Sequence, residues 1–392
     1  MRVLISGAGI AGPALAFWLH RAGADVTIVE KAPGMRPGGH AVDIRGVAKG
    51  VVDRMGLTAA IRAEQVDERG IALVDKRGRR LAEMPADLFG GEGIVAEIEI
   101  ARGDLSRVLI EATATMADYR FGDRITALTP DGRVTFQSGG TSQYDVVVGA
   151  DGVHSGVRAL SFGPQDRFVR PLGCYGALFT VPDMGDLDHW AHMYNAPGGR
   201  VVLVRPTRDG RAMAGLNFVT SKRYGRLSRP EQLGLIARNL AGAGWKVPSL
   251  LAAMPDAEDF YFDSVDQVHV DRWSRGRTVL LGDAGYCGSP LAGLGTSMSI
   301  VGAYVLAGEL ATRPDPAAAF EAYQSGMASY VKEGMQLPPG GIHAYAPKSR
   351  LMIRARAASM RSMSRWPMKQ MLAKQFGKAD AITLKDYDLA AR

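Results

Sequence analysis

The stretch VLISGAGIAGP, from Val3 to Pro13, decides the fold of this chain. Its apolar start, Val3 to Ile5, is typical of a buried parallel strand. The glycines that follow are spaced GxGxxG, and Pro13 stands near the first turn of a helix, where a missing N–H group costs nothing. A helix is predicted from Ala14 to Arg21, and a second strand from Asp25 to Glu30. The pattern therefore predicts a strand–helix–strand unit that opens a doubly wound α/β domain.

Each glycine of this turn suits a bound dinucleotide. Gly7 allows the tight turn, Gly9 lets the backbone approach a pyrophosphate, and Gly12 lets helix and strand pack closely. The helix N-terminus would direct free N–H groups at the phosphates. Glu30 lies 18 residues after Gly12, where it could accept hydrogen bonds from an adenosine ribose. The alternative is a glycine-rich turn without a ligand. The motif predicts a dinucleotide but does not distinguish FAD from NAD.

A second glycine-rich stretch, GDAGYCGSPLAGLGTSMS from Gly282 to Ser299, suits a flavin. It lies between an apolar run and a helical pattern. Asp283 could accept a hydrogen bond from a ribityl hydroxyl, while Gly293, Gly295 and Thr296 could bring backbone N–H groups against the ring. The helix that begins there would direct its positive end at the flavin. The alternative for this stretch is a glycine-rich turn with a helix cap.

A third motif lies between these two. Asp145 to Gly152 predicts a buried strand that ends in an Asp-Gly turn, and the segment EIARGDLSRVLI contains Arg102. With GxGxxG at Gly7, Asp-Gly at Asp151 and Gly-Asp at Gly282 in this order, the chain resembles the single-component (group A) FAD-dependent aromatic hydroxylases. The segment GGHAVDIRG, residues 38–46, is most similar to their tetracycline-inactivating monooxygenase branch.

The resemblance implies FAD as cofactor and NADPH or NADH as co-substrate. By the same likeness, Asp43 would lie near the flavin and Arg36 would meet the nicotinamide nucleotide. The chain departs from the family pattern at Tyr286, where histidine is common, and at Ser297, where asparagine is frequent. The predicted FAD contacts are Gly7, Gly9, Ile10, Ala11, Gly12, Glu30, Lys31, Asp43, Arg102, Asp151, Asp283, Pro290, Gly293, Leu294, Gly295 and Thr296.

The expected reaction is hydroxylation of an aromatic or polycyclic small molecule, such as a polyketide or antibiotic. In the family, NAD(P)H reduces FAD, and the reduced flavin takes up O2 as a C4a-hydroperoxide that attacks an electron-rich ring. The base that would activate the substrate is not identified. His192 and Tyr286 are candidates, with structural roles as the alternative. Other functions on this fold are a flavin dehydrogenase, a halogenase (its WxWxIP motif is absent) and a flavin-binding scaffold without turnover.

The chain is expected to divide into two domains and a helical end. Residues 1–72, 101–172 and 266–330 would form the FAD domain. Residues 73–100 and 173–265 would form a mainly antiparallel substrate domain, because short strands separated by Gly/Pro turns are predicted there. Residues 331–392 would form C-terminal helices that bridge both domains.

The composition restricts the partners. The 392 residues carry a net charge of +7 without a long basic tract or a nucleic-acid recognition motif, so no nucleic-acid partner is predicted. Two distant cysteines form neither a disulfide framework nor a CxxC site, which suits a reducing cytoplasm, and no metal site is predicted. No apolar run reaches the roughly 18 residues of a membrane span, and no stable membrane association is expected. The oligomeric state is left open between a monomer and a homodimer.

Overall fold

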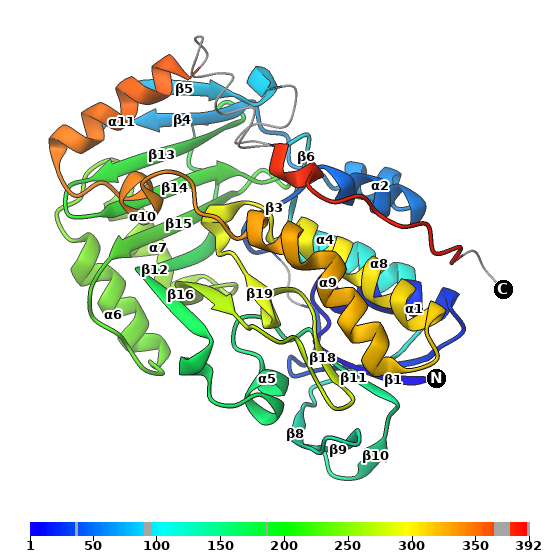
Figure 1. Ribbon diagram of the computed structural model, residues 1–392. Coiled ribbons are helices and arrows are strands. Elements are labelled where there is room, and N and C mark those ends of the chain that lie inside the picture. Colours follow the sequence, from blue (N-terminus) through cyan, green and yellow to red (C-terminus); the bar gives the residue numbers. More distant parts are fainter. Residues whose placement is uncertain (36–37, 90–95, 186, 364–376, 390–392) are drawn as a thin grey trace.

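The computed structural model describes residues 1–35, 38–89, 96–185, 187–363 and 377–389 (Figure 1). It contains the predicted architecture: a parallel-sheet unit, a large mainly antiparallel sheet and a helical C-terminal segment. The helices are α1 (Ala11–Arg21), α2 (Val47–Arg54), α3 (Thr58–Ala63), α4 (Arg102–Thr113), α5 (Gly156–Ser161), α6 (Arg229–Leu240), α7 (Val247–Ala253), α8 (Gly295–Thr312), α9 (Pro316–Gly334), α10 (Gly341–Tyr345) and α11 (Arg350–Ser362).

The parallel unit has the strand order β17-β18-β11-β1-β2-β7. Its strands pair in parallel except for the edge hairpin β17–β18, and the valine-rich β11 and the apolar core of β1 are buried on both faces. In Figure 1, helices α1, α8 and α9 lie above this sheet and a small antiparallel sheet lies below it. The strands are β1 (Arg2–Ser6), β2 (Asp25–Glu30), β7 (Asp118–Phe121), β11 (Val146–Gly149), β17 (Ser274–Arg275), β18 (Thr278–Leu280) and, in the small sheet, β8 (Ile125–Leu128), β9 (Arg133–Phe136) and β10 (Thr141–Gln143).

The large sheet has eight strands in the order β19-β16-β12-β15-β14-β13-β4-β5, and all its pairs are antiparallel except β13 with β4. The short strands predicted within residues 173–265 include β13, β14 and β15. The strands are β4 (Gly70–Val74), β5 (Arg80–Pro85), β12 (Val169–Val181), β13 (Trp190–Ala196), β14 (Arg200–Pro206), β15 (Ala212–Val219), β16 (Tyr261–His269) and β19 (Tyr286–Cys287).

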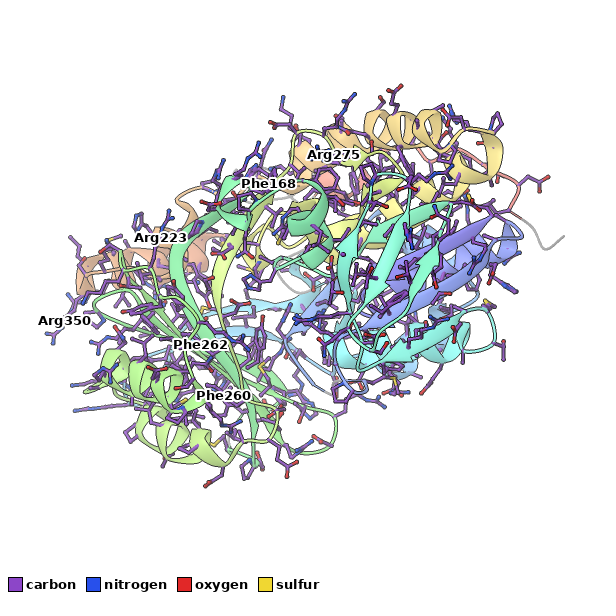
Figure 2. All side chains as sticks on the ribbon, turned by 90° about the horizontal axis from the view of Figure 1, so that it is seen from below. Phe168, Arg223, Phe260, Phe262, Arg275 and Arg350 are labelled. Carbon is purple, nitrogen blue, oxygen red and sulfur yellow. The ribbon has the colours of Figure 1, made fainter. Side chains whose placement is uncertain are left out.

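The two faces of the large sheet differ. On one, which we call the outer face, Ala177, Phe179 and Leu216 are buried against α6 and α7. Phe260 and Phe262 lie along this side in Figure 2. On the opposite, inner face, Leu178, Leu203 and Asn217 are only half-buried. Because side chains alternate along a strand, this difference indicates that the outer face is core. The inner face borders open space around Leu178 and Asn217, whereas α11 covers it toward β13, β4 and β5.

A two-stranded sheet, β3 (Ala41–Ile44) with β6 (Ile98–Ala101), lies between the parallel unit and the large sheet in Figure 1. Strand β5, from the region 73–100, joins the large sheet together with β4, which begins at Gly70, within the range expected for the FAD domain. Strand β6 pairs with β3 instead. The register sets Asp43 opposite Glu99. Two carboxylates from distant parts of the sequence are thereby neighbours.

The end of the chain contacts both units. Helix α11 packs on β5 and β13, whereas residues 377–389 run back over α2 and α8. Glu309 of α8 is buried and binds Lys385 (2.7 Å) and the Tyr387 hydroxyl (2.8 Å), which attaches this segment to the helix. None of the helices in the described ranges is both long and apolar enough to cross a membrane.

Candidate FAD and substrate site

The backbone of the first glycine turn packs so closely that no side chain fits at Gly7 or Gly12. Gly7 has φ of 112°, and a Cβ atom there would lie 2.5 Å from the carbonyl oxygen of Ala150. A Cβ atom at Gly12 would lie 2.0 Å from the carbonyl oxygen of Gly7. A Cβ atom placed on Gly9 would lie 3.3 Å from a guanidinium nitrogen of Arg102. The N-terminus of α1 and a cation therefore face the same point, as a pyrophosphate requires.

Glu30 ends β2 beside this turn. One oxygen accepts the backbone N–H of Ala8 (3.0 Å) and the other accepts the N–H of Ala32 (2.9 Å). Two backbone amides thus fix the carboxylate at the edge of the glycine turn, and each oxygen keeps a further lone pair for a ribose hydroxyl. The neighbouring Lys31 is exposed.

Asp151 holds the Asp-Gly turn together. Its carboxylate accepts the N–H groups of Gly156 (2.8 Å) and Val157 (3.2 Å) and the hydroxyl of Ser155. It therefore caps α5, and burial raises its pKa while these donors lower it. The side chain already has three local donors, so its effect on a cofactor would come from the shape of the turn. Its direct contact with FAD stays a prediction.

Arg158 joins the Asp-Gly turn to the late glycine stretch. Its side chain is completely buried and donates to the carbonyl oxygens of Ala284 (2.9 Å) and Val153 (2.6 Å). Two motifs more than 120 residues apart in the sequence are thus held side by side. The sequence contains this arginine directly after the motif, but only the structure gives its partners.

The late stretch forms the other side of the site. Asp283 is half-buried near the start of α8, with its Oδ1 at 3.7 Å from a Cβ atom placed on Gly295. Burial raises the pKa of Asp283, whereas the charge of Arg102 lowers it. Gly293 has φ of 72° and open space beside it. Leu294 is buried, Thr296 is half-buried and Pro290 is exposed. Arg102 thus lies between the first glycine turn and the acid of the second.

Ser289 and Ser297 lie within the late stretch but were not among the predicted FAD contacts. Ser289 has φ of 71°, rare for a residue with a side chain, and its buried hydroxyl has no hydrogen-bond partner among the described residues. The buried Ser297 accepts the N–H of Arg45 (2.9 Å) and donates to the carbonyl oxygen of Asp43 (3.5 Å). This hydroxyl fastens the first turn of α8 to the end of β3.

Comparisons with known proteins agree on one family. The sequence signature described as "FAD binding domain" matches residues 1–337. An uncharacterized protein of Mycobacterium tuberculosis is 43% identical over 336 residues, which cover 84% of this chain and 89% of that protein. A flavin-dependent monooxygenase of an unknown prokaryotic organism is 39% identical, with 84% and 86% covered. The crystal structure of tetracycline destructase Tet(51) superposes with a TM-score of 0.82 at 30% identity and covers 99% of both chains.

The chain belongs to the FAD-dependent monooxygenases. The predicted family, fold class and enzyme class are confirmed, and FAD is confirmed as the cofactor of this family. The glycine turns, Arg102 and Asp283 fit FAD because they leave space, positive charge and an acceptor where its parts would lie. The individual contacts stay predictions, as do the domain boundaries. Arg36, predicted to meet the nicotinamide nucleotide, lies outside the described residues.

The surroundings of the two candidate bases of this monooxygenase indicate that both side chains have structural roles. His192 pairs with Val204 across β13 and β14, on the outer face, and lies 6.4 Å from the ring of Trp245. Tyr286 is fully buried, its hydroxyl lies 2.6 Å from that of Tyr323, and burial raises its pKa to about 12. A buried phenol with so high a pKa does not act as a base near neutral pH. We therefore propose neither residue as the base.

A buried charge cluster was missed at the sequence level. Arg205, on the inner face, binds Glu99 (2.5 Å) of β6 and also Glu68. Near it, Asp43 binds Arg45 at 2.8 Å, and His40 has its pKa lowered to about 4 by burial and by the charges of Arg102 and Arg205. No local motif marks such a cluster, since its members come from four separate segments. The one available signal was an arginine, Arg205, that directly follows the apolar run from Val201 to Val204.

Asp283→Ala is expected to lower the affinity for FAD while the fold is kept, because the charge-assisted hydrogen bond predicted between its carboxylate and the cofactor would be lost. Such bonds contribute roughly 1.5–3 kcal/mol, which corresponds to about a tenfold weakening or more. Flavin fluorescence titration of the apoprotein measures the change. Asp271→Ala, at an exposed aspartate, is the matched control. Unchanged FAD affinity in Asp283→Ala would mean that this carboxylate does not contact the cofactor.

Proposed function

We propose that this monooxygenase uses NAD(P)H and O2 to hydroxylate a planar aromatic or polycyclic small molecule. The molecule would lie between the late glycine stretch and the inner face of the large sheet. The tetracycline destructase with the same fold makes an antibiotic-like polyketide the first substrate class to test. Biosynthetic tailoring and drug inactivation both fit this class.

The observation that carries the proposal is the half-buried inner face together with what borders it. At one side of this face, Asp263 binds His154 of the Asp-Gly turn, with 3.0 Å between Oδ2 and Nε2. At another, Arg205 binds Glu99 of β6. The strand register pairs Asp263 with Gly176, Gly176 with Asn217 and Asn217 with Val201. Val201 precedes Arg205 by four residues, an even number, so Asp263 and Arg205 lie on the same face. The inner face therefore looks toward the cofactor-binding motifs.

The surface of this face suits a flat ligand. Gly176 and Gly215 lie on it in neighbouring strands, and each flanks the amide of Asn217. A Cβ atom at Gly176 would lie 2.2 Å from the Asn217 Oδ1, so the amide lies over the bare backbone. Leu178 and Leu203 add half-buried apolar surface. Apolar surface with one polar amide is the usual lining of a small-molecule site.

FAD, when bound, supplies the redox chemistry by taking a hydride from NAD(P)H and activating O2. The chain's own residues would hold and orient it. Arg102 and the α1 N-terminus would bind the pyrophosphate, Asp283 would bind the ribityl chain, and the start of α8 would stabilise negative charge on the ring. The inner face would hold the substrate and exclude water.

The nicotinamide nucleotide is proposed to dock transiently. The sequence contains one GxGxxG in a strand–helix–strand unit, and Glu30 would repel a 2′-phosphate at the ribose position of that unit. We expect no nicotinamide nucleotide to copurify and slow flavin reduction by NADPH alone. A suitable phenol should accelerate the reduction, because it favours a flavin position that meets the nicotinamide. Stopped-flow absorbance of the oxidised flavin measures this, and rapid reduction without any aromatic ligand would contradict it.

A screen of planar phenols and polycyclic polyketides tests the function itself. The expected result is ligand-accelerated NADPH oxidation with gain of one oxygen atom in the product and little H2O2. A product that has lost two hydrogens would indicate a dehydrogenase. A product that forms only when halide is present would indicate a halogenase. FAD and ligand binding with no NADPH consumption in any reaction would indicate a scaffold.

A further inference from the structure

The cluster around Arg205 contains two buried carboxylate oxygens that accept no hydrogen bond from the described residues. The guanidinium uses one oxygen of Glu68 and one of Glu99, whose side chains are 1% and 10% exposed. The second oxygen of each carboxylate is buried without a hydrogen-bond partner among the described residues. A buried carboxylate oxygen without a donor is costly unless the group takes up a proton. Two such oxygens, on either side of one arginine, therefore mark a place where a proton is stabilised.

Asp43 extends this cluster toward the cofactor. It stands opposite Glu99 across β3 and β6, and its side chain, 17% exposed, is the most accessible of the three carboxylates. Burial raises the pKa of Asp43 to about 6, and the charge of Glu99 adds to this increase, whereas Arg45 and Arg205 oppose it. Burial also raises the pKa of Glu68. His40 adds no charge near neutral pH, since its pKa is lowered to about 4.

We propose that Asp43, Glu99 and Glu68 form a proton-holding site that supplies one proton per turnover to the flavin side of the enzyme, with Asp43 as its outlet. The proposal rests on the proposed function. In that reaction the substrate, O2, NAD(P)H and one H⁺ give the hydroxylated product, water and NAD(P)⁺. The hydride supplies the electron pair, one oxygen atom enters the product, and the other leaves as water.

The proposed path follows the register of β3 and β6, which sets Asp43 opposite Glu99. The leaving oxygen needs a proton from solvent, and the two half-satisfied glutamates stabilise that proton inside the protein. The backbone of Asp43 and Arg45 binds Ser297 in the first turn of α8, so the end of β3 is attached to the helix end that would be directed at the flavin. Asp43 would release the proton there and be reprotonated through Glu99.

Infrared difference spectroscopy during a pH titration of the FAD-loaded protein tests the site without turnover. In the wild type we expect a signal from a buried protonated carboxyl that disappears with a midpoint of about pH 6. Asp43→Asn should remove the signal that has this midpoint. Glu99→Gln removes the charge that opposes ionisation of Asp43, so the midpoint should fall. Glu97→Gln, an exposed position two residues away in an ion pair with Lys49, should leave signal and midpoint unchanged.

The absence of a protonated-carboxyl signal between about pH 4 and pH 8 in the wild type would overturn the proposal, as would the same midpoint in Glu99→Gln and wild type. Should Asp43→Asn fail to fold, the Glu99→Gln comparison still decides. In single turnovers with a substrate, product formation should slow by at least about tenfold in Asp43→Asn. An infrared signal that behaves as expected in a protein that hydroxylates nothing would refute the function and leave the proton-holding site standing.

Discussion

Gly12→Ala is expected to yield a protein that purifies without FAD. The added Cβ atom would lie 2.0 Å from the carbonyl oxygen of Gly7 and 3.3 Å from Ile5, so the backbone itself must move. The turn would then lose at least two of the N–H contacts to the pyrophosphate. At roughly 1.5–3 kcal/mol for each charge-assisted bond, the affinity for FAD should fall by about a hundredfold or more.

The matched control for Gly12→Ala is Gly50→Ala. Gly50 also lies within a helix, α2, but a Cβ atom there meets nothing within 4 Å. Alanine at that position should keep FAD and stabilise the protein by up to about 1 kcal/mol. Flavin absorbance of the purified variants and titration of their apoproteins with FAD measure both effects. Full flavin occupancy in Gly12→Ala would show that the first glycine turn does not hold the pyrophosphate.

Arg205→Met is expected to destabilise the protein by about 3–5 kcal/mol, the cost of removing one partner from a buried ion pair. Methionine fills part of the space but leaves the carboxylates of Glu68 and Glu99 without their cation. Urea unfolding at neutral pH measures the loss. Arg211→Met removes a surface arginine that pairs with Asp209, and this control should cost less than about 1 kcal/mol. A loss of less than about 1 kcal/mol in Arg205→Met as well would contradict the claim that Arg205 neutralises buried carboxylates.

The destabilisation by Arg205→Met should also depend on pH. Burial already raises the pKa of Glu68 above its ordinary value of 4.5, and the loss of Arg205 raises it further. The folded variant then binds more protons than the unfolded chain, so its free energy of unfolding falls as the pH rises through the raised pKa. We expect the variant to be most stable in mildly acidic buffer. Adding Glu68→Gln and Glu99→Gln should restore stability at neutral pH.

The sequence by itself determined the parts of the site that depend on local spacing. The spacing of Gly7, Gly9 and Gly12 between a strand and a helix indicates a tight turn, and at Gly7 and Gly12 only glycine tolerates the backbone contacts found there. Glu30 ends the next strand of the same strand–helix–strand unit, so its position beside the turn also follows from a short stretch of sequence. The order of the three motifs indicated the monooxygenase family, and the alternation of short strands indicated an antiparallel sheet.

Only the tertiary structure decided which distant side chains meet. His192 was a candidate base, yet the strand register turns it to the outer face and turns Arg205 to the inner one, since each step along a strand changes the face. Glu68, Glu99 and Arg205 are separated by up to 137 residues, and no spacing along the chain encodes their contact. Tyr286 stands inside a motif, but packing with Tyr323 buries it. Local patterns determine where turns and strands form. Long-range pairing determines which face of a sheet a side chain occupies, whether it is buried and which charged groups it contacts.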